Sequence, residues 1–130
     1  MAKFSSESED KLSKCDSRIV EVMRTVIQFI DFTIICGHRN QRDQDIAYNL
    51  GNSKVKYPES KHNTMPSKAI DVAPYPLNWG DTESFIYLAG YIMMTAELLD
   101  IKLKWGGDWN RNDRTIDEKF RDIGHFEIDE

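Results

Sequence analysis

Two short segments in which residue types alternate place the strongest constraint on how this chain folds. Residues 69–73 carry Asp71 and two alanines at alternate positions, with β-branched residues between them. Residues 125–128 carry His125 and Glu127 in alternation with two apolar residues. Because successive side chains of a strand point to opposite faces of a sheet, each segment predicts a strand with one apolar face and one face offering ligands.

The remaining pattern predicts helices and further short strands around these two segments. Apolar residues recur at helical spacing in two stretches, and β-branched or aromatic runs mark two more strands. The order of elements predicts an α+β fold, with a small antiparallel sheet, helices against one face and a single domain over residues 1–130. The expected elements are a polar lead-in or short capped helix over 4–15, helix 19–30, strand 32–36, helix 40–50, loop 53–66, strand 69–73, helix 82–99, strand 102–105 and a last strand around 125–128.

Charge and hydropathy exclude several classes of function. The formal net charge is −5 and the sequence pI is about 5.2, so we expect no nucleic-acid partner and no stable membrane association. No apolar run approaches the ~18 residues that span a bilayer, and the polar N-terminus lacks a secretory signal. We expect a monomer that is made and folded in a cytoplasm, with Cys15 and Cys36 as reduced, buried thiols.

The chain contains three histidines, which makes the search for a metal site short. Catalytic zinc sites commonly use three protein ligands, usually histidines with one carboxylate, and leave a fourth position to water. His62 precedes the strand that carries Asp71, and His125 lies on the ligand-bearing face of the last strand. These three side chains are therefore the candidate ligands, with His38 as the competitor.

A carboxylate near the candidate ligands could act as a general base. Asp122 precedes His125 by three residues, in the expected turn before the last strand. A base must lie beside the attacking water without binding the metal itself, and this position meets that need. The alternatives are that Asp122 only caps the turn and that Glu127 is the base.

One loop partly resembles a calcium-binding site, but its sequence does not complete the pattern. Asp108, Asn110 and Asn112 resemble the first positions of a calcium-binding loop. However, Asp113 stands where such a loop needs glycine, and Lys119 stands where it needs glutamate.

Several short motifs resemble those of a known peptidase family. Three segments carry the resemblance: Ser60-Lys61-His62, Ala69-Ile70-Asp71 and Asp122-Ile123-Gly124-His125-Phe126-Glu127. They resemble, in that order, the motifs S-x-H, A-x-D and [DE]-x-x-H. These motifs are typical of the D-Ala-D-Ala carboxypeptidase / L-alanyl-D-glutamate peptidase family of zinc peptidases (VanY-like). The phage endolysin branch is further matched by Gly37-His38-Arg39 followed by Gln44, and by Trp105-Gly106-Gly107-Asp108-Trp109. The resemblance runs from about Phe4 to the C-terminus and implies the fold shared by these peptidases and the Hedgehog signalling domain.

The resemblance implies a role for each matching residue. His62, Asp71 and His125 would bind zinc, Asp122 would be the catalytic base, and Arg39 would steady the scissile carbonyl and its oxyanion. Arg39 could instead pair with an acidic group at the surface. Nine positions separate His62 from Asp71, more than is usual in the family, so the loop between them is longer. Supporting or substrate-contacting roles are expected for Ser60, Glu127, Trp105 and Asp108.

The implied function is that of a zinc-dependent endolysin. Such an enzyme hydrolyses the L-Ala–D-Glu bond of the peptidoglycan stem peptide, its expected partner, and so contributes to cell-wall degradation and host lysis by a bacteriophage. It would reach the wall from the host cytoplasm once the membrane has been permeabilised. The alternatives are a D-Ala-D-Ala di- or carboxypeptidase, and a non-catalytic zinc-containing module that binds the wall.

Overall fold

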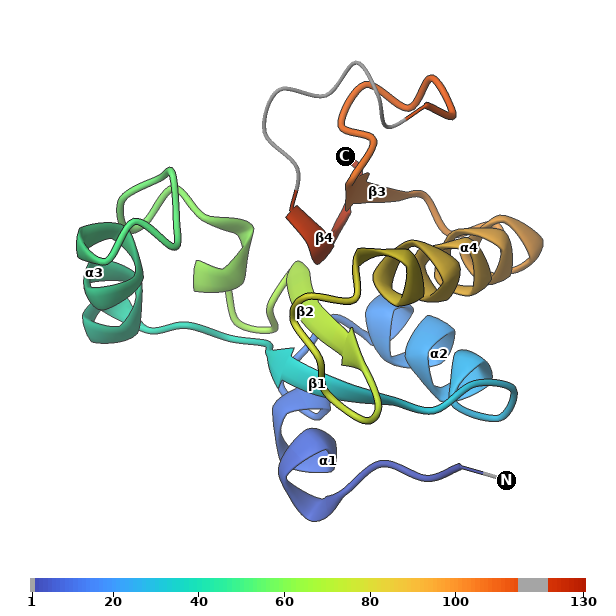
Figure 1. The fold of residues 1–130 in the computed structure, drawn as a ribbon. Helices are drawn as coiled ribbons and strands as arrows, with labels where there is room; N and C mark the ends of the chain where they lie inside the picture. Colours follow the sequence, from blue (N-terminus) through green and yellow to red (C-terminus); the bar gives the residue numbers. More distant parts are fainter. Residues whose placement is uncertain (1, 115–121) are drawn as a thin grey trace.

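One antiparallel sheet organises the chain, as a computed structural model that describes residues 2–114 and 122–130 shows (Figure 1). Its described strands lie in the order β1-β2-β4-β3, so β2 and β4 are the inner pair. The expected α+β fold with an antiparallel sheet is confirmed. The strands are β1 (Phe32–Cys36), β2 (Ala69–Pro74), β3 (Leu103–Gly106) and β4 (Asp122–Ile128).

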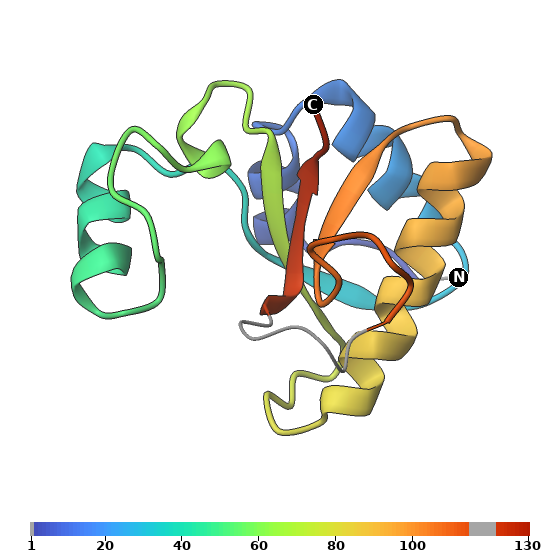
Figure 2. The same ribbon diagram turned by 90° about the horizontal axis from the view of Figure 1, so that it is seen from above.

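Helices surround this sheet unevenly. Helices α2 and α4 pack against each other beside the sheet, whereas α3 stands apart on the opposite side of the molecule (Figures 1 and 2). Among the described residues, no helix combines the length and the apolar character needed to cross a membrane. The helices are α1 (Ser6–Leu12), α2 (Ser17–Val26), α3 (Gln41–Asn49), α4 (Thr82–Leu98) and a short 3₁₀ helix, η1 (Lys61–Asn63), inside the expected loop.

Helix α2 starts as expected but ends one turn early. Asp16 caps it by accepting a hydrogen bond from the backbone of Arg18. The expected helix 19–30 stops at Val26, where the chain tightens into turns before β1. The carbonyl of Val26 accepts hydrogen bonds from Phe29 and Ile30, which closes the end of the helix and reverses the chain.

The inner position of β2 changes one expectation. Ala69 and Ala73 were expected on the same face as Asp71, the face that offers ligands, and both alanines are fully buried. A strand with neighbours on both edges leaves little of either face open, so only Asp71 and the terminal Pro74 of β2 remain partly exposed. In β4, Phe126 and Ile128 are buried as expected and Glu127 is half-buried, but His125 is buried as well.

The core lies between the apolar face of the sheet and the helices. Each fully buried aliphatic or aromatic side chain there contributes about 1.5–3 kcal/mol through removal of apolar surface from water. Burial raises the pKa of the Cys15 thiol to about 12, which keeps it protonated and inert. Cys36 is also a free thiol, but it is only half-buried because it borders the site described next. The largest fully buried core side chains include Phe126, Leu12, Ile19, Met23, Ile34, Ile70, Leu88, Ile92, Leu103 and Ile128.

Candidate metal centre

The pairing of β2 with β4 brings Asp71 and His125 face to face. They are direct partners in the register of the two strands, and His125 Nδ1 lies 2.9 Å from Asp71 Oδ1. The other nitrogen, His125 Nε2, lies 2.8 Å from Glu127 Oε1, and Lys61 Nζ forms an ion pair of 3.3 Å with that glutamate. A carboxylate on the far nitrogen is the usual device that orients a metal-binding imidazole.

Helix η1 supplies the second imidazole. Ser60 caps this helix by accepting a hydrogen bond of 3.1 Å from the His62 backbone, and Asn63 completes a capping box. The Nδ1 atom of His62 lies 2.6 Å from the carbonyl oxygen of Gly37. A carbonyl only accepts hydrogen bonds, so Nδ1 carries a proton and Nε2 is the nitrogen that can offer a lone pair to a metal once it is deprotonated. The expected supporting role of Ser60 agrees with this cap and stays a prediction.

The free nitrogen of His62 is unusual. Among the described residues, His62 Nε2 is buried without a hydrogen-bond partner, although Asp71 Oδ2 lies 3.3 Å away. A buried polar atom without a partner costs about 1–3 kcal/mol, which proteins seldom accept without reason. A metal ion would satisfy it, and the ring centroids of His62 and His125 are 5.2 Å apart.

The surrounding donors fit a divalent metal of the zinc type. Ligand atoms of Asp71, Asp122 and His125 lie within 4.8 Å of one another, as do those of Cys36, His62 and Asp71. Two imidazoles and one carboxylate form the donor set common in catalytic zinc sites. His38 belongs to neither group.

The electrostatics of the centre hold charge on both histidines when no metal is bound. Burial disfavours the charged form of His62, but its interactions with Asp71 outweigh this and raise the pKa to about 10. The same opposition in His125, with Asp71 and Glu127 as the acidic neighbours, raises its pKa to about 9. Burial also opposes ionisation of Asp71, yet its two imidazole partners hold its pKa far below the usual range. A metal ion must therefore displace protons when it binds.

Asp122 is the first residue of β4, whereas the sequence predicted it in the turn before this strand. Its backbone packs against β3 so closely that a Cβ on Gly106 would lie 2.1 Å from the Asp122 carbonyl oxygen. Burial raises the pKa of the Asp122 carboxyl, and the nearby charge of Asp71 raises it further. A carboxylate with a raised pKa beside a candidate metal is suited to proton transfer near neutral pH.

Arg39 does not form the surface ion pair considered as an alternative. Its side chain is only 16% exposed, and Nη2 lies 3.3 Å from Asp71 Oδ2. The backbone N–H of Arg39 donates a hydrogen bond of 2.8 Å to the carbonyl of His62, so the residue is attached to η1 as well. The guanidinium therefore lies at the candidate centre.

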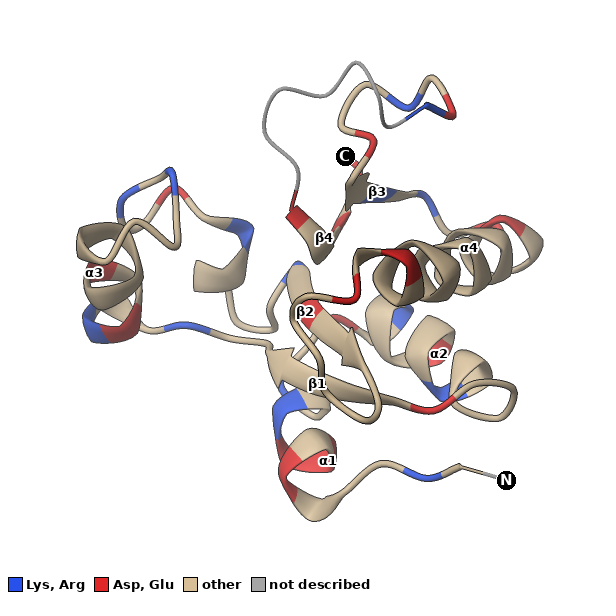
Figure 3. Ribbon diagram, in the orientation of Figure 1, with Lys and Arg blue, Asp and Glu red and all other residues tan. Residues whose placement is uncertain are grey.

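A cavity of about 260 Å³ opens onto these groups. Its lining includes Trp109, residues of β4 and residues of the segment between α3 and η1. The expected residues that line it are Arg39, Ser60, His62, Asp122, His125 and Glu127. Along the ribbon, Lys and Arg residues are interspersed with Asp and Glu residues in every part of the molecule (Figure 3).

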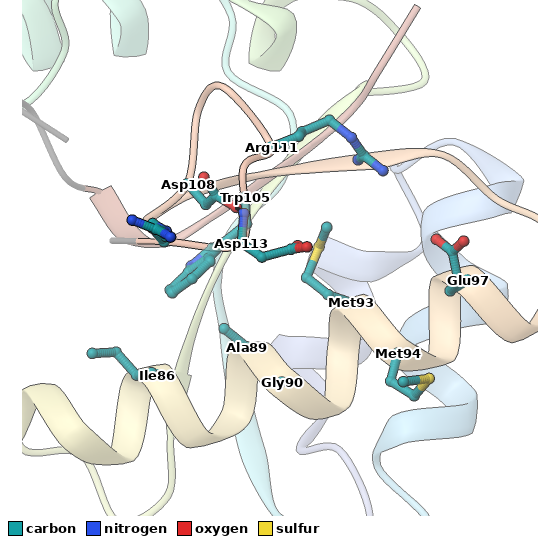
Figure 4. Close-up of a pocket in the computed structure, with 11 residues that line it drawn as sticks. Ile86, Ala89, Gly90, Met93, Met94, Glu97, Trp105, Asp108, Arg111 and Asp113 are labelled. Carbon is teal, nitrogen blue, oxygen red and sulfur yellow. Dashed lines mark hydrogen bonds between the residues drawn. The ribbon is translucent and has the colours of Figure 1, made fainter. Parts of the chain in front are cut away.

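Two residues expected at the site lie elsewhere. Trp105 and Asp108 line a second cavity, of about 680 Å³, between α4 and the segment that follows β3 (Figure 4). The indole N–H of Trp105 donates a hydrogen bond of 2.9 Å to the carbonyl of Ile123, which makes Trp105 a packing residue behind β4. Lys119, considered for a calcium loop, lies outside the described residues.

Sequence reasoning missed Cys36 as a neighbour of the centre. Its Sγ lies 3.9 Å from His62 Nδ1, and it stands at the end of β1 opposite Asp71. The only available signal was its place directly before Gly37, at the end of a predicted strand.

Two imidazoles, paired carboxylates and a guanidinium gathered at one site fit the donor set of a metal-dependent hydrolase. The family profile described as "Phage L-alanyl-D-glutamate peptidase" matches residues 1–128, and the chain belongs to this family. The L-alanyl-D-glutamate peptidase of Escherichia phage T5 is 36% identical over 137 residues, which cover 97% of this chain and 97% of that protein. The resemblance and the peptidase class that the sequence predicted are thereby confirmed.

A solved structure supports the fold independently. The crystal structure of the Serratia marcescens L-Ala D-Glu endopeptidase ChiX superposes with a TM-score of 0.76 at 22% sequence identity. The similarity covers 98% of this chain and 90% of that chain. At this level of identity the likeness concerns the fold.

Proposed function

We propose that this peptidase uses a zinc ion bound by His62, Asp71 and His125 to hydrolyse the L-Ala–D-Glu bond of peptidoglycan stem peptides. The observation that carries the metal assignment is the buried Nε2 of His62, which has no hydrogen-bond partner among the described residues and faces Asp71. The names of the family and of the phage T5 relative support the choice of bond.

The chain's own groups divide the work of hydrolysis. Asp122 accepts a proton from the attacking water and then gives a proton to the leaving amine, a task that its raised pKa favours. Arg39 donates hydrogen bonds to the carbonyl oxygen as negative charge develops there, and one such preorganised donor is worth about 3–4 kcal/mol. When bound, zinc supplies a Lewis acid and an activated water.

The groups around the ligands keep them in place. Glu127 accepts a hydrogen bond from His125 Nε2, and Lys61 holds the glutamate through its ion pair. Ser60 fixes the start of η1 and with it the direction of His62. These contacts favour the roles expected for Ser60 and Glu127, because residues that hold a metal ligand in place tune metal affinity.

The setting of the reaction follows from the substrate. We propose that a single domain acts as a monomer on the bacterial cell wall, as a phage endolysin, once the host membrane has been permeabilised. Its net charge of −5 gives no general attraction to anionic membranes, so contact with the wall rests on recognition of the peptide.

The test is digestion of purified peptidoglycan with mass spectrometry of the products. Wild type and the Asp122→Ala variant are compared at matched zinc content, measured by elemental analysis. Fragments that end at L-Ala, lost in the variant while zinc stays bound, support both the bond and the base. Release of free D-Ala instead identifies a carboxypeptidase, and bound zinc without any cleavage by wild type identifies a wall-binding module.

A further inference from the structure

Helix α3 is attached to the protein in an unusual way. A surface helix normally docks through an apolar stripe, but the one buried residue of α3 is Gln44, which is fully buried. Its apolar residue Ile46 is 45% exposed, and Leu50, just after the helix, is 70% exposed. The helix stands away from the sheet in both views (Figures 1 and 2). A polar side chain therefore provides its principal buried contact.

The amide of Gln44 uses its full hydrogen-bonding capacity. Nε2 donates to Ser53 Oγ and to the carbonyl of Val55, each at 2.8 Å. Oε1 accepts from Arg39 Nη1 at 3.1 Å and from Asn63 Nδ2 at 3.2 Å. An amide has two donors and two acceptor sites, so each is occupied. Four hydrogen bonds therefore hold the Gln44 amide in one orientation.

These partners all belong to the candidate centre or its cavity. Arg39 is the expected oxyanion donor, Asn63 belongs to the helix that carries His62, and Ser53 and Val55 line the cavity. A guanidinium is planar with donors in a fixed fork, so a bond to one nitrogen sets the direction of the others. Gln44 holds Nη1 of Arg39 while Nη2 lies beside Asp71.

We propose that Gln44 is a positioning residue that fixes the guanidinium of Arg39 and attaches the Ser53–Val55 wall of the cavity to the metal centre. Its role in turnover rests on the proposed function, because Arg39 acts there on the substrate carbonyl. Gln44 itself touches no substrate, since it is fully buried. Its contribution to kcat passes through Arg39 and is absent when Arg39 is absent, whereas its bonds to the cavity wall act on KM.

The first experiment is a double-mutant cycle on zinc-loaded protein with purified peptidoglycan as substrate. Gln44→Met keeps the length of the side chain and removes its four hydrogen bonds. We expect a loss in kcat of about 10- to 100-fold in the wild-type background, the scale of a misplaced catalytic group. In the Arg39→Met background the same change should lower kcat by less than about twofold, because the two residues act on turnover as one unit. Equal losses in both backgrounds would assign Gln44 a merely structural role and overturn the proposal.

Two further variants sharpen the result. Gln41→Met makes the same chemical change at an exposed position of the same helix, and we expect wild-type activity. Gln44→Glu keeps an acceptor for Arg39 but loses the donors to the cavity wall. It should preserve kcat better than Gln44→Met does while raising KM. A Gln44→Glu variant with the same kcat as Gln44→Met contradicts the assignment.

A measurement without substrate separates this inference from the proposed function. In nitrogen-15 NMR of zinc-loaded protein, a held guanidinium rotates slowly about its Cζ–Nη bonds. We expect slow exchange for Arg39 in wild type and in Gln41→Met, and fast exchange in Gln44→Met. If wild type cleaves no peptide, the proposed function fails while this measurement still decides whether Gln44 holds Arg39. Unchanged exchange in Gln44→Met overturns the inference.

Discussion

Replacement of Gly37 by alanine should weaken metal binding through a residue that touches no metal. A Cβ at this position would lie 2.8 Å from the carbonyl oxygen of Lys11 and 3.0 Å from Cys15 Sγ. Nonbonded atoms attract best near ~3.5 Å, so the backbone must move by about 0.7 Å. The obstacle is backbone at the end of α1, which cannot turn aside as a flexible side chain would.

The displaced atom matters because the Gly37 carbonyl orients His62. Its hydrogen bond to Nδ1 is 2.6 Å long, and a shift of this size breaks it or turns the ring. Loss of such an outer partner typically reduces metal affinity about 10- to 100-fold. The overpacking itself should lower the free energy of unfolding by about 1–3 kcal/mol. We therefore expect a higher zinc Kd in a protein that still folds.

The assay is competition for zinc with a chelator of known affinity, together with thermal unfolding of the metal-free protein. Gly90→Ala is the matched control, because no atom lies within 4 Å of the added Cβ at this position in α4. The control should keep its zinc affinity and gain about 0.5–1 kcal/mol in stability from the removal of a helical glycine. Wild-type zinc affinity in a folded Gly37→Ala protein would refute the reasoning.

Three other outcomes follow from the same geometry. Gly106→Ala should displace Asp122, because the Asp122 carbonyl would lie 2.1 Å from the new Cβ. We expect kcat to fall at least about tenfold at unchanged zinc content, measured by steady-state kinetics and elemental analysis. Zinc affinity should rise as the pH increases, by about tenfold per unit for each proton displaced. The sign follows because the pKa values of His62 and His125, about 10 and about 9, keep the metal-free imidazoles protonated at neutral pH, and chelator competition between pH 6.5 and 8.5 would test it. Removal of zinc by a chelator should lower the free energy of unfolding by about 4 kcal/mol relative to protein with zinc at ~1,000 times its Kd, as calorimetry would measure.

The sequence predicted those parts of the fold that depend on local pattern. Strand alternation located β2 and the second half of β4 and predicted that Asp71 and His125 belong to the site, because a period of two follows from backbone geometry alone. The end of α2 was misjudged because the apolar spacing continues past Val26 while the chain already turns toward β1. The burial of Ala69 depends on the neighbours of β2, which no local pattern specifies.

The contacts around the centre were harder to predict because they join segments far apart in the chain. The bond between Gln44 and Arg39 and the bond between Gln44 and Val55 require the segment after α3 to fold back toward the helix. The sequence offered a glutamine at a motif position but no indication that it is buried. Cys36 was likewise expected in the core, since its closeness to His62 appears only after β1 pairs with β2.

Two independent structural features together place the ligands of the centre. The register of β2 and β4 places Asp71 against His125, and a slip by one residue would turn one of these side chains to the opposite face. The capped η1 and the carbonyl of Gly37 then direct His62 at the same carboxylate. Neither feature alone brings both imidazoles to Asp71. A substitution that disturbs either one should therefore reduce metal affinity without removing a ligand, whereas one that disturbs Arg39 through Gln44 should reduce turnover and leave the affinity unchanged.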